Sequence, residues 1–220
     1  MRYNRLSRYK ILKIIRCFCE DVNATSASKI LGLNRNTINL YYNHFRRLIF
    51  QLSFSEKAHD FGVFELDESY FGAKRIRGKR GRGAAEKTPV FGLLKRGGRV
   101  FVTVVVPNCS REELLPIIQG KILKGSTLHT DGWKAYDGLV LNGDDHYRVF
   151  HSENEFARGK NHVNGIECFW SFAKRRLAKF NGIQSEAFIL HLKESEFRFN
   201  NRKSDLAKVI LKLFNKSMRC

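Results

Sequence analysis

Three acidic residues occupy positions from which their carboxylates can act together on one substrate. Asp67 ends a β-rich run that begins at Val63, and Asp131 ends a second short run that begins at Ser126. Glu167 lies within a segment whose apolar residues recur at helical spacing. Strand-end carboxylates are neighbours if their strands are adjacent in one sheet, and a helix packed across that sheet brings in a third. We therefore expect Asp67, Asp131 and Glu167 to form one catalytic site.

Three carboxylates at one point repel each other, so such a site needs a cation to neutralise them. Hard oxygen ligands favour Mg²⁺ or Mn²⁺, which keep several waters and accept phosphate oxygens as further ligands. Two such ions roughly 3.5–4 Å apart activate a water or a 3′-hydroxyl and stabilise the leaving oxygen of a phosphoryl displacement. The acids thus predict Mg²⁺- or Mn²⁺-dependent phosphodiester chemistry, with Asp67, Asp131 and Glu167 as the metal ligands.

Each acid also has a rival or a purely structural interpretation. Glu68 competes with Asp67, but strand alternation places Glu68 on the opposite face, which favours Asp67. The residue after Asp131 is a glycine, a pairing that is common in simple turns, and Asp137 is a further candidate.

The third ligand has two candidates on one helical face. Asn164 lies three residues before Glu167, so both side chains project from the same side of a helix. The alternative for Glu167 is an exposed helix charge, against which stands its place between Ile166 and the aromatic pair Phe169-Trp170. Asn164 is therefore kept beside Glu167 as a catalytic residue that shares or replaces its role.

The composition indicates a folded, soluble and strongly basic protein. The chain has 220 residues, with 40 Lys and Arg against 21 Asp and Glu, and a formal net charge of +19. Hydrophobic residues make up 43% of it, which is enough for a core and argues against a disordered basic tail. No apolar run is long enough for a membrane span, and no secretory h-region follows the basic first residues. The expected partner is a polyanion, most commonly a nucleic acid.

The five cysteines indicate a reducing compartment. Cys17 and Cys19 are too close together for an ordinary disulfide framework, and no CxxC pair supports a zinc ribbon. We therefore expect free thiols and a cytoplasmic, nucleoid-associated protein.

Residues 1–55 predict a small helical module. Apolar residues from Ile11 to Phe18 recur at helical spacing, and Gly32 separates two further helical patterns by a turn that favours a left-handed backbone. Asn34 is the expected N-cap of the second of these helices. This is the helix-turn-helix pattern, in which the first residues of the second helix meet base edges in the DNA major groove. Those residues are Arg35, Asn36, Thr37 and Asn39.

Residues 60–202 predict an α/β core. The β-rich runs Val90–Leu94 and Val100–Val106 flank a Gly-Gly turn and predict a hairpin. Helical patterns follow at 161–179, 185–199 and 204–216. The last pattern belongs to residues 203–220, which we expect to form a separate C-terminal helix.

Two basic stretches flank the acids. Residues 72–88 are too polar and too Gly-rich to pack, so we expect a mobile loop that contacts phosphates without reading sequence. Its expected DNA-binding residues are Lys79, Arg80 and Arg82. Lys174 lies seven residues after Glu167 and shares its helix face. We expect Lys174, Arg175 and Arg176 to hold DNA near the carboxylates.

Three segments of the core, taken in order, carry a resemblance to a known family. They are Glu65-Leu-Asp-Glu-Ser-Tyr-Phe-Gly, His129-Thr-Asp-Gly-Trp-Lys-Ala-Tyr and His162-Val-Asn-Gly-Ile-Glu-Cys-Phe-Trp-Ser-Phe-Ala-Lys-Arg-Arg-Leu. They resemble the DDE transposases of bacterial insertion sequences, and among these the short subgroup with an integrase-like transposase domain. The resemblance covers about residues 60–202, and the interval between Asp131 and Glu167 is similar to that of the wider superfamily.

The resemblance implies a fold, a reaction and partners. The fold is a ribonuclease-H-like mixed sheet flanked by helices, and the reaction is metal-dependent cleavage of 3′ ends followed by strand transfer. No covalent enzyme intermediate forms in that reaction. The partners are double-stranded DNA, as transposon ends and as target, and further copies of the chain in a homo-oligomer assembled on DNA. Some relatives use an Asn near the third acid, which is a second reason to keep Asn164.

Two other functions are compatible with the same sequence. The first is a non-catalytic helix-turn-helix regulator, which would bind DNA whether or not Asp67 and Asp131 are intact. The second is a ribonuclease-H-like nuclease or resolvase, which would cleave nucleic acid without strand transfer.

Overall fold

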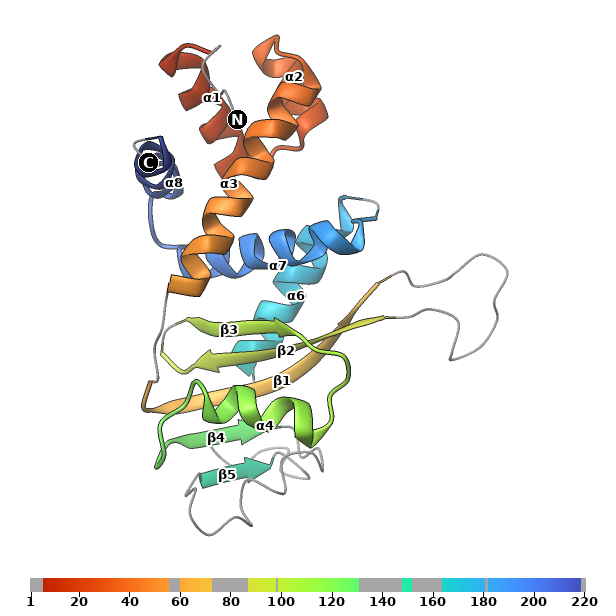
Figure 1. Cartoon of the computed structure of the whole chain (residues 1–220), viewed down its shortest axis with the longest axis vertical. Coiled ribbons are helices and arrows are strands. Elements are labelled where there is room, and N and C mark those ends of the chain that lie inside the picture. The colour runs from red at the N-terminus through yellow and green to blue at the C-terminus, as the bar shows by residue number, and fades with distance from the viewer. Residues whose placement is uncertain are drawn as a thin grey trace, which may run out of the picture. The chain divides into compact units, whose positions relative to one another are not determined.

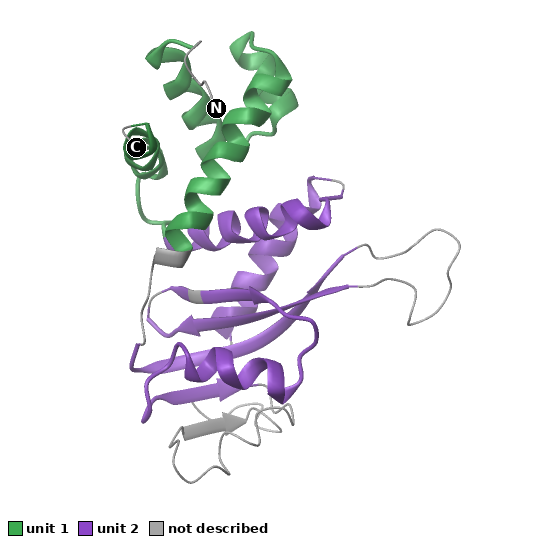
Figure 2. Ribbon diagram, in the orientation of Figure 1, with its two compact units in different colours: residues 1–56, 201–220 green, residues 57–200 purple. Residues whose placement is uncertain are grey.

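The computed structural model describes residues 6–55, 60–72, 87–97, 99–130, 148–151, 164–180 and 182–218. The chain forms two compact units, drawn in different colours in Figure 2. The first comprises residues 1–56 and 201–220, and the second comprises residues 57–200. The C-terminal helix, which the sequence suggested as a segment of its own, is thus part of the same unit as the N-terminal helices.

The first unit is built from helices. They are α1 (Arg8–Cys19), α2 (Ala24–Leu31), α3 (Arg35–Ser55) and α8 (Leu206–Ser217). The side chains of Ser7, Asn23 and Asp205 cap three of them by accepting hydrogen bonds from N–H groups of the first turn. Gly32 ends α2 in the left-handed conformation, with φ at 61°, as the turn between α2 and α3 requires. The Oδ1 atom of Asn34 then accepts a hydrogen bond from the N–H of Asn36 at 2.8 Å.

Aromatic rings form the centre of this unit. The ring centre of Phe18 lies 5.2 Å from that of Tyr42 and 5.3 Å from that of Phe45. Phe45 in turn lies 5.8 Å from Phe214 of α8. This packing explains why α8 belongs to the unit: its buried apolar residues, Ile210 and Phe214, complete the same core.

The second unit contains a five-stranded mixed sheet (Figure 1). The strands are β1 (Val63–Phe71), β2 (Thr88–Lys95), β3 (Val100–Val105), β4 (Thr127–Thr130) and β5 (Arg148–His151). Their order in the sheet is β3-β2-β1-β4-β5. β1–β2 and β2–β3 are antiparallel, whereas β1–β4 and β4–β5 are parallel. This α/β arrangement is compatible with the expected ribonuclease-H-like fold, and the hairpin predicted around the Gly-Gly turn is confirmed as β2–β3.

Helices cover both faces of the sheet (Figure 1). The helix α4 (Arg111–Gln119) packs on one face, where Leu114 and Ile118 join a cluster with Phe64 and Leu66 of β1. The helix α6 (Asn164–Ala178) packs on the other face, and α7 (Ser185–Asn200) packs against α6 and β3. The apolar residues that recur at helical spacing in α6 are all buried, namely Ile166, Phe169, Trp170, Ala173 and Leu177. No described helix is long and apolar enough to cross a membrane.

α7 also forms hydrogen bonds with β3, which is an edge strand of the sheet. The Asn200 side chain makes two hydrogen bonds of 2.8 Å with the backbone of Val100, one to its N–H and one to its carbonyl. Glu196 accepts hydrogen bonds from both the backbone N–H and the hydroxyl of Thr103. Because unpaired edge groups invite association with other strands, these contacts protect the sheet.

Candidate active site

Asp67 lies in the middle of β1, not at its end as the sequence suggested. The difference arises because β1 continues to Phe71 in an antiparallel pair with β2. Strand alternation turns Asp67 toward the α6 side of the sheet, together with Glu65, and turns Glu68 to the opposite side. The Asp67 side chain is half-buried, and its Oδ1 atom accepts a hydrogen bond from the N–H of Glu68 at 2.8 Å.

Glu65 joins the strand of Asp67 to the first turn of α6. Its carboxylate is buried, and its Oε2 atom accepts a hydrogen bond from the N–H of Ile166 at 2.9 Å. Its Oε1 atom forms an ion pair of 2.9 Å with Nε of Arg96. The N–H groups and the dipole at a helix N-terminus stabilise an anion. Glu65 therefore holds the helical turn of Glu167 against the strand of Asp67.

Two glycines allow α6 to approach the sheet closely. Gly92 on β2 pairs with Asp67, and a Cβ atom at Gly92 would lie only 2.5 Å from the Trp170 ring. A Cβ atom at Gly165, in the first turn of α6, would lie 2.8 Å from Oε2 of Glu65. A larger residue at Gly92 would push against the Trp170 ring of the helix, and one at Gly165 would displace the Glu65 carboxylate that anchors its first turn.

Both candidates for the third ligand lie at the accessible start of α6. Asn164 and Glu167 are exposed, one helical turn apart, on the turn that Glu65 anchors. Neither side chain is used in the packing of the helix. Within the described residues, both are therefore accessible from solvent at that turn.

β4 carries the chain to the residue before the second predicted ligand. His129 pairs with Glu65 across the parallel β1–β4 ladder, and both side chains are buried. Burial lowers the pKa of the His129 imidazole, with a further lowering by Arg96 and an opposing effect of Glu65. The described part of β4 ends at Thr130. It lies next to β1, so the adjacency that the sequence argument required is present.

Several predicted site residues lie outside the described part of the chain. They are Asp131, its rival Asp137, and the basic residues Lys79, Arg80 and Arg82. Within the described ranges, no group of three His, Cys, Asp or Glu side chains is placed to hold a metal ion.

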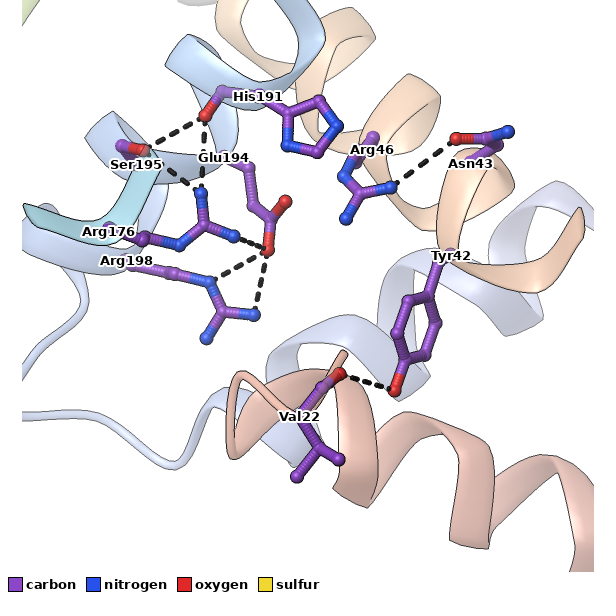
Figure 3. A network of polar contacts seen from close by, with 9 residues as sticks. All are labelled: Val22, Tyr42, Asn43, Arg46, Arg176, His191, Glu194, Ser195 and Arg198. Atoms are coloured by element: carbon purple, nitrogen blue, oxygen red, sulfur yellow. Dashed lines mark hydrogen bonds and ion pairs between the residues drawn. The ribbon is translucent and has the colours of Figure 1, made fainter. Parts of the chain in front are cut away.

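The three basic residues after Glu167 have different environments. Lys174 and Arg175 are exposed, and the Nζ atom of Lys174 lies 5.8 Å from the ring centre of Phe71. Arg176 is only 6% exposed, and its guanidinium forms an ion pair with Glu194 (Figure 3). The expected DNA contact of Arg176 is therefore corrected: this side chain is used inside the fold.

The partners of Arg176 form a buried network between α6 and α7. Glu194 is 1% exposed and accepts both Arg176 and Arg198, with a distance of 2.8 Å to Nη2 of Arg198. Arg176 also donates a hydrogen bond of 3.1 Å to the hydroxyl of Ser195. Figure 3 shows the two arginines converging on Glu194. The network holds α7 against α6, because a buried charge is stable only with its partners in place.

In the first unit, too, some basic residues are exposed and others are buried. Arg35 and Asn36 are exposed at the start of α3, where the sequence analysis expected contacts to DNA bases. Arg46, later in α3, is only 7% exposed. Its guanidinium lies 5.8 Å from the ring centre of Phe18 and donates a hydrogen bond to Asn43 (Figure 3). Arg46 therefore has a structural role.

Sequence reasoning missed Glu65, Gly92 and Gly165. A signal for Glu65 was present, because it lies two residues before Asp67 and strand alternation places both on one face. For the glycines there was none, since their role depends on Trp170 and Glu65, which are distant in the sequence.

The second unit is similar in sequence to known proteins. Residues 61–200 match the ISXO2-like transposase domain. Over 99 residues the chain is 50% identical to an "Uncharacterized transposase-like protein" of Haemophilus influenzae, in an alignment that covers 45% of this chain and 80% of that protein. Over 154 residues it is 30% identical to an "Uncharacterized protein in transposable element ISH50" of Halobacterium salinarum. That alignment covers 62% of this chain and 52% of the Halobacterium salinarum protein, so the chain spans about half of that relative.

Proposed function

This chain belongs to the ISXO2-like family of insertion-sequence transposases, and from this membership we propose that it cuts and joins DNA by metal-dependent phosphodiester chemistry. In this proposal the protein cleaves the 3′ ends of its element and transfers them to target DNA. The metal ligands are Asp67, Asp131 and Glu167, with Asn164 as the alternative third ligand.

The observation that carries the proposal is the junction between β1 and α6. The hydrogen bond from the Ile166 N–H to Glu65 joins the helical turn of Glu167 to the strand of Asp67. Gly92 lets that helix lie close to the sheet beside Asp67. Such rigid support of reacting groups is what catalysis by positioning needs.

The donor set has the chemistry of a site for a hard divalent cation. Asp67, Asp131 and Glu167 offer carboxylate oxygens, and Asn164 offers an amide oxygen, which are ligands of the kind that Mg²⁺ prefers. Bound there, Mg²⁺ or Mn²⁺ would supply the activation of a water or 3′-hydroxyl and charge stabilisation of the leaving oxygen. The protein's part is to keep these oxygens on one side of the sheet.

Some of the proposed DNA contacts are exposed residues of the structure, and others are basic residues identified from the sequence. In the core they are Lys174 and Arg175 on α6, together with the basic stretch that contains Lys79, Arg80 and Arg82. In the first unit, α2, the left-handed Gly32 and α3 support a helix-turn-helix that presents Arg35 and Asn36 to the terminal repeats. The active assembly is proposed to be a homo-oligomer, because two ends must be held together during transposition.

The proposal is tested with labelled duplex DNA carrying either end of the element that surrounds the coding sequence. With Mn²⁺, the wild-type protein should cut at the 3′ end, and Asp131→Ala should bind the same duplex in a mobility-shift assay without cutting it. Equal cutting by both proteins would reject Asp131 as a ligand. Binding without cutting by the wild type would favour the non-catalytic regulator.

A precleaved end distinguishes a transposase from a nuclease or resolvase. The wild-type protein should join such an end to a second DNA molecule, whereas a nuclease would only hydrolyse it. Glu167→Gln and Asn164→Ala, compared in both the cleavage assay and the joining assay, identify the third ligand, because the variant that removes it should lose both steps.

A further inference from the structure

The last helix of the chain, α8, has an apolar side and a basic side. Ile210 and Phe214 are buried in the core of the first unit. A helix turns by about 100° per residue, so Lys208, Lys212 and Lys216 project from the opposite side, and all three are exposed. These three residues, the lysine row of α8, occupy successive turns of the helix.

The stability of α8 does not account for the lysine row. Like charges four residues apart repel each other and destabilise a helix. Lys208 also lies in the first turn, where the helix dipole disfavours a positive charge. α8 itself contains no acidic residue, and its N-cap Asp205 forms only an exposed ion pair of 3.5 Å with Lys208, which contributes little. In the part of the chain that the structure describes, Lys212 and Lys216 form no ion pair, so their charges are available to an anionic partner.

A DNA duplex matches the length and the even spacing of the lysine row. Residues four apart on a helix are separated by about 6 Å along its axis, so the three lysines span about 12 Å. Over that length a duplex carries about seven phosphate charges, since it has one per about 1.7 Å of its axis. Flexible lysine side chains reach such charges without a fixed geometry. The row therefore suits a line of phosphates better than a single small anion.

The apolar side of α8 distinguishes DNA from a membrane as the partner. A basic amphipathic helix binds an anionic membrane surface only when its apolar face can enter the bilayer. In α8 that face is occupied, because the ring centre of Phe214 lies 6.3 Å from that of Tyr41 and 5.8 Å from that of Phe45 on α3. The hydroxyl of Ser217 also forms a hydrogen bond of 3.3 Å with Nε2 of His44. These contacts favour DNA.

The same contacts connect α8 to the proposed helix-turn-helix. His44 lies nine residues after Arg35, the first residue of α3, which is about 14 Å along the helix axis. A helix packed on α3 at this distance can contact the backbone of the duplex whose bases α3 would read.

We propose that the lysine row of α8 binds the phosphate backbone of DNA and adds to the affinity of the first unit without reading base sequence. This inference rests on the proposed function and deepens it, since it adds a contact surface for the transposon end beyond the helix-turn-helix and the core.

The test measures the salt dependence of DNA binding by the whole chain, without divalent metal. Two labelled duplexes of equal length, one with an element end and one with a scrambled sequence, are titrated in a fluorescence anisotropy assay at several salt concentrations. Lys212→Gln combined with Lys216→Gln should reduce the slope of log affinity against log salt by about 2, because each phosphate contact contributes about 0.9. The affinity for both duplexes should fall by the same factor.

Two matched variants identify the cause of that change. Lys121→Gln combined with Lys124→Gln removes the same charge from positions of the second unit that are at least partly exposed, and it should keep the wild-type slope. Lys212→Arg combined with Lys216→Arg retains the charge on α8 and should keep the slope as well. The thermal midpoint of the glutamine variant of α8 should change little, because Gln and Lys have similar helix propensities.

Four results would overturn the proposal. The first is an unchanged slope in the glutamine variant of α8. The second is an equal decrease in the Lys121→Gln, Lys124→Gln variant, which would assign the effect to net charge. The third is a loss of affinity confined to the element end, which would indicate base reading. The fourth is an unchanged DNA slope with lost binding to vesicles containing phosphatidylserine, which would assign the row to a membrane.

Cleavage in Mn²⁺ is a separate measurement, so the two proposals can fail independently. A wild-type protein that does not cut DNA but shows the expected difference in slope would reject the proposed chemistry and support the role of α8. A protein that cuts DNA, with the same slope in the wild type and in the glutamine variant of α8, would reject only that role.

Discussion

The two faces of the sheet in the second unit use the same strands for different purposes. On the α4 face, β1 contributes Phe64 and Leu66 to a cluster of buried apolar side chains. On the α6 face, the alternate residues of β1 are Glu65, Asp67 and Ser69, followed by Phe71 only at the end of the strand. The apolar core on this side is supplied by other elements, chiefly by α6, α7 and β2.

The difference shows how one strand can contribute both to a core and to the proposed site. A period of two separates neighbouring residues onto opposite faces, so Leu66 can stabilise the fold while Asp67 lies on the face of the proposed site. The polar face needs partners for its buried groups, because a buried charge without one is costly. Glu65 has such partners in Ile166 and Arg96.

The largest expected effect comes from removing the charge on the polar face. Asp67→Asn should lower strand cleavage by more than about 100-fold, because even groups behind metal ligands are commonly worth 10- to 100-fold. The thermal midpoint should change little. Glu68→Gln, which alters the neighbouring residue on the other face, is the control and should retain activity. A similar loss in both variants would contradict the assignment of the site to one face.

A change on the apolar face should affect stability instead. Leu66 is fully buried, so Leu66→Ala should lower the free energy of unfolding by about 2–5 kcal/mol. Urea denaturation followed by circular dichroism measures this loss. Below the transition, cleavage per folded molecule should stay near the wild-type value. A catalytic defect as large as that of Asp67→Asn would mean that the two faces are not separable.

The approach of α6 to the polar face can be altered at Gly92. Gly92→Ala places a methyl group against the Trp170 ring and should cost about 1–3 kcal/mol of stability, with reduced cleavage because α6 is displaced. Combining it with Trp170→Leu removes the obstructing ring. The double variant should then be more stable than the sum of the two single effects predicts. Strict additivity would show that the close contact is not the cause.

The smallest effect is expected for the residue that joins β1 to α6. Glu65→Gln keeps an acceptor for the Ile166 N–H but loses the charge that pairs with Arg96, so cleavage should fall by about tenfold. Arg96→Gln should have a similar effect, and the double variant should be little worse than either. Full activity of Glu65→Gln would limit its role to packing.

Local patterns predicted most of the helices and strands. The left-handed glycine after α2, the cap at Asn34, the β2–β3 hairpin and the buried side of α6 all depend on neighbours a few residues away. The length of β1 was not predictable in that way. The second half of β1 pairs with β2, which follows in the chain only after residues 73–86. The strand that lets β1 continue past Asp67 is therefore outside the reach of a local sequence pattern.

The basic residues show the same limit most clearly. Composition indicated an excess of positive charge and hence a polyanionic partner, because charge is a sum over residues and needs no fold. Composition does not show which arginines are exposed and can contact that partner. Lys174 and Arg176 are two residues apart, yet one is exposed and the other is buried against Glu194.

Residue types and short-range periodicity therefore identified the candidate acids, several of the helices, and the family that these motifs resemble. The folded arrangement alone assigned Arg176 and Arg46 to the interior and Glu65 to the start of α6. The physical reason is that burial of a charge depends on a partner of opposite charge or an aromatic face, and these partners come from segments far apart in the chain.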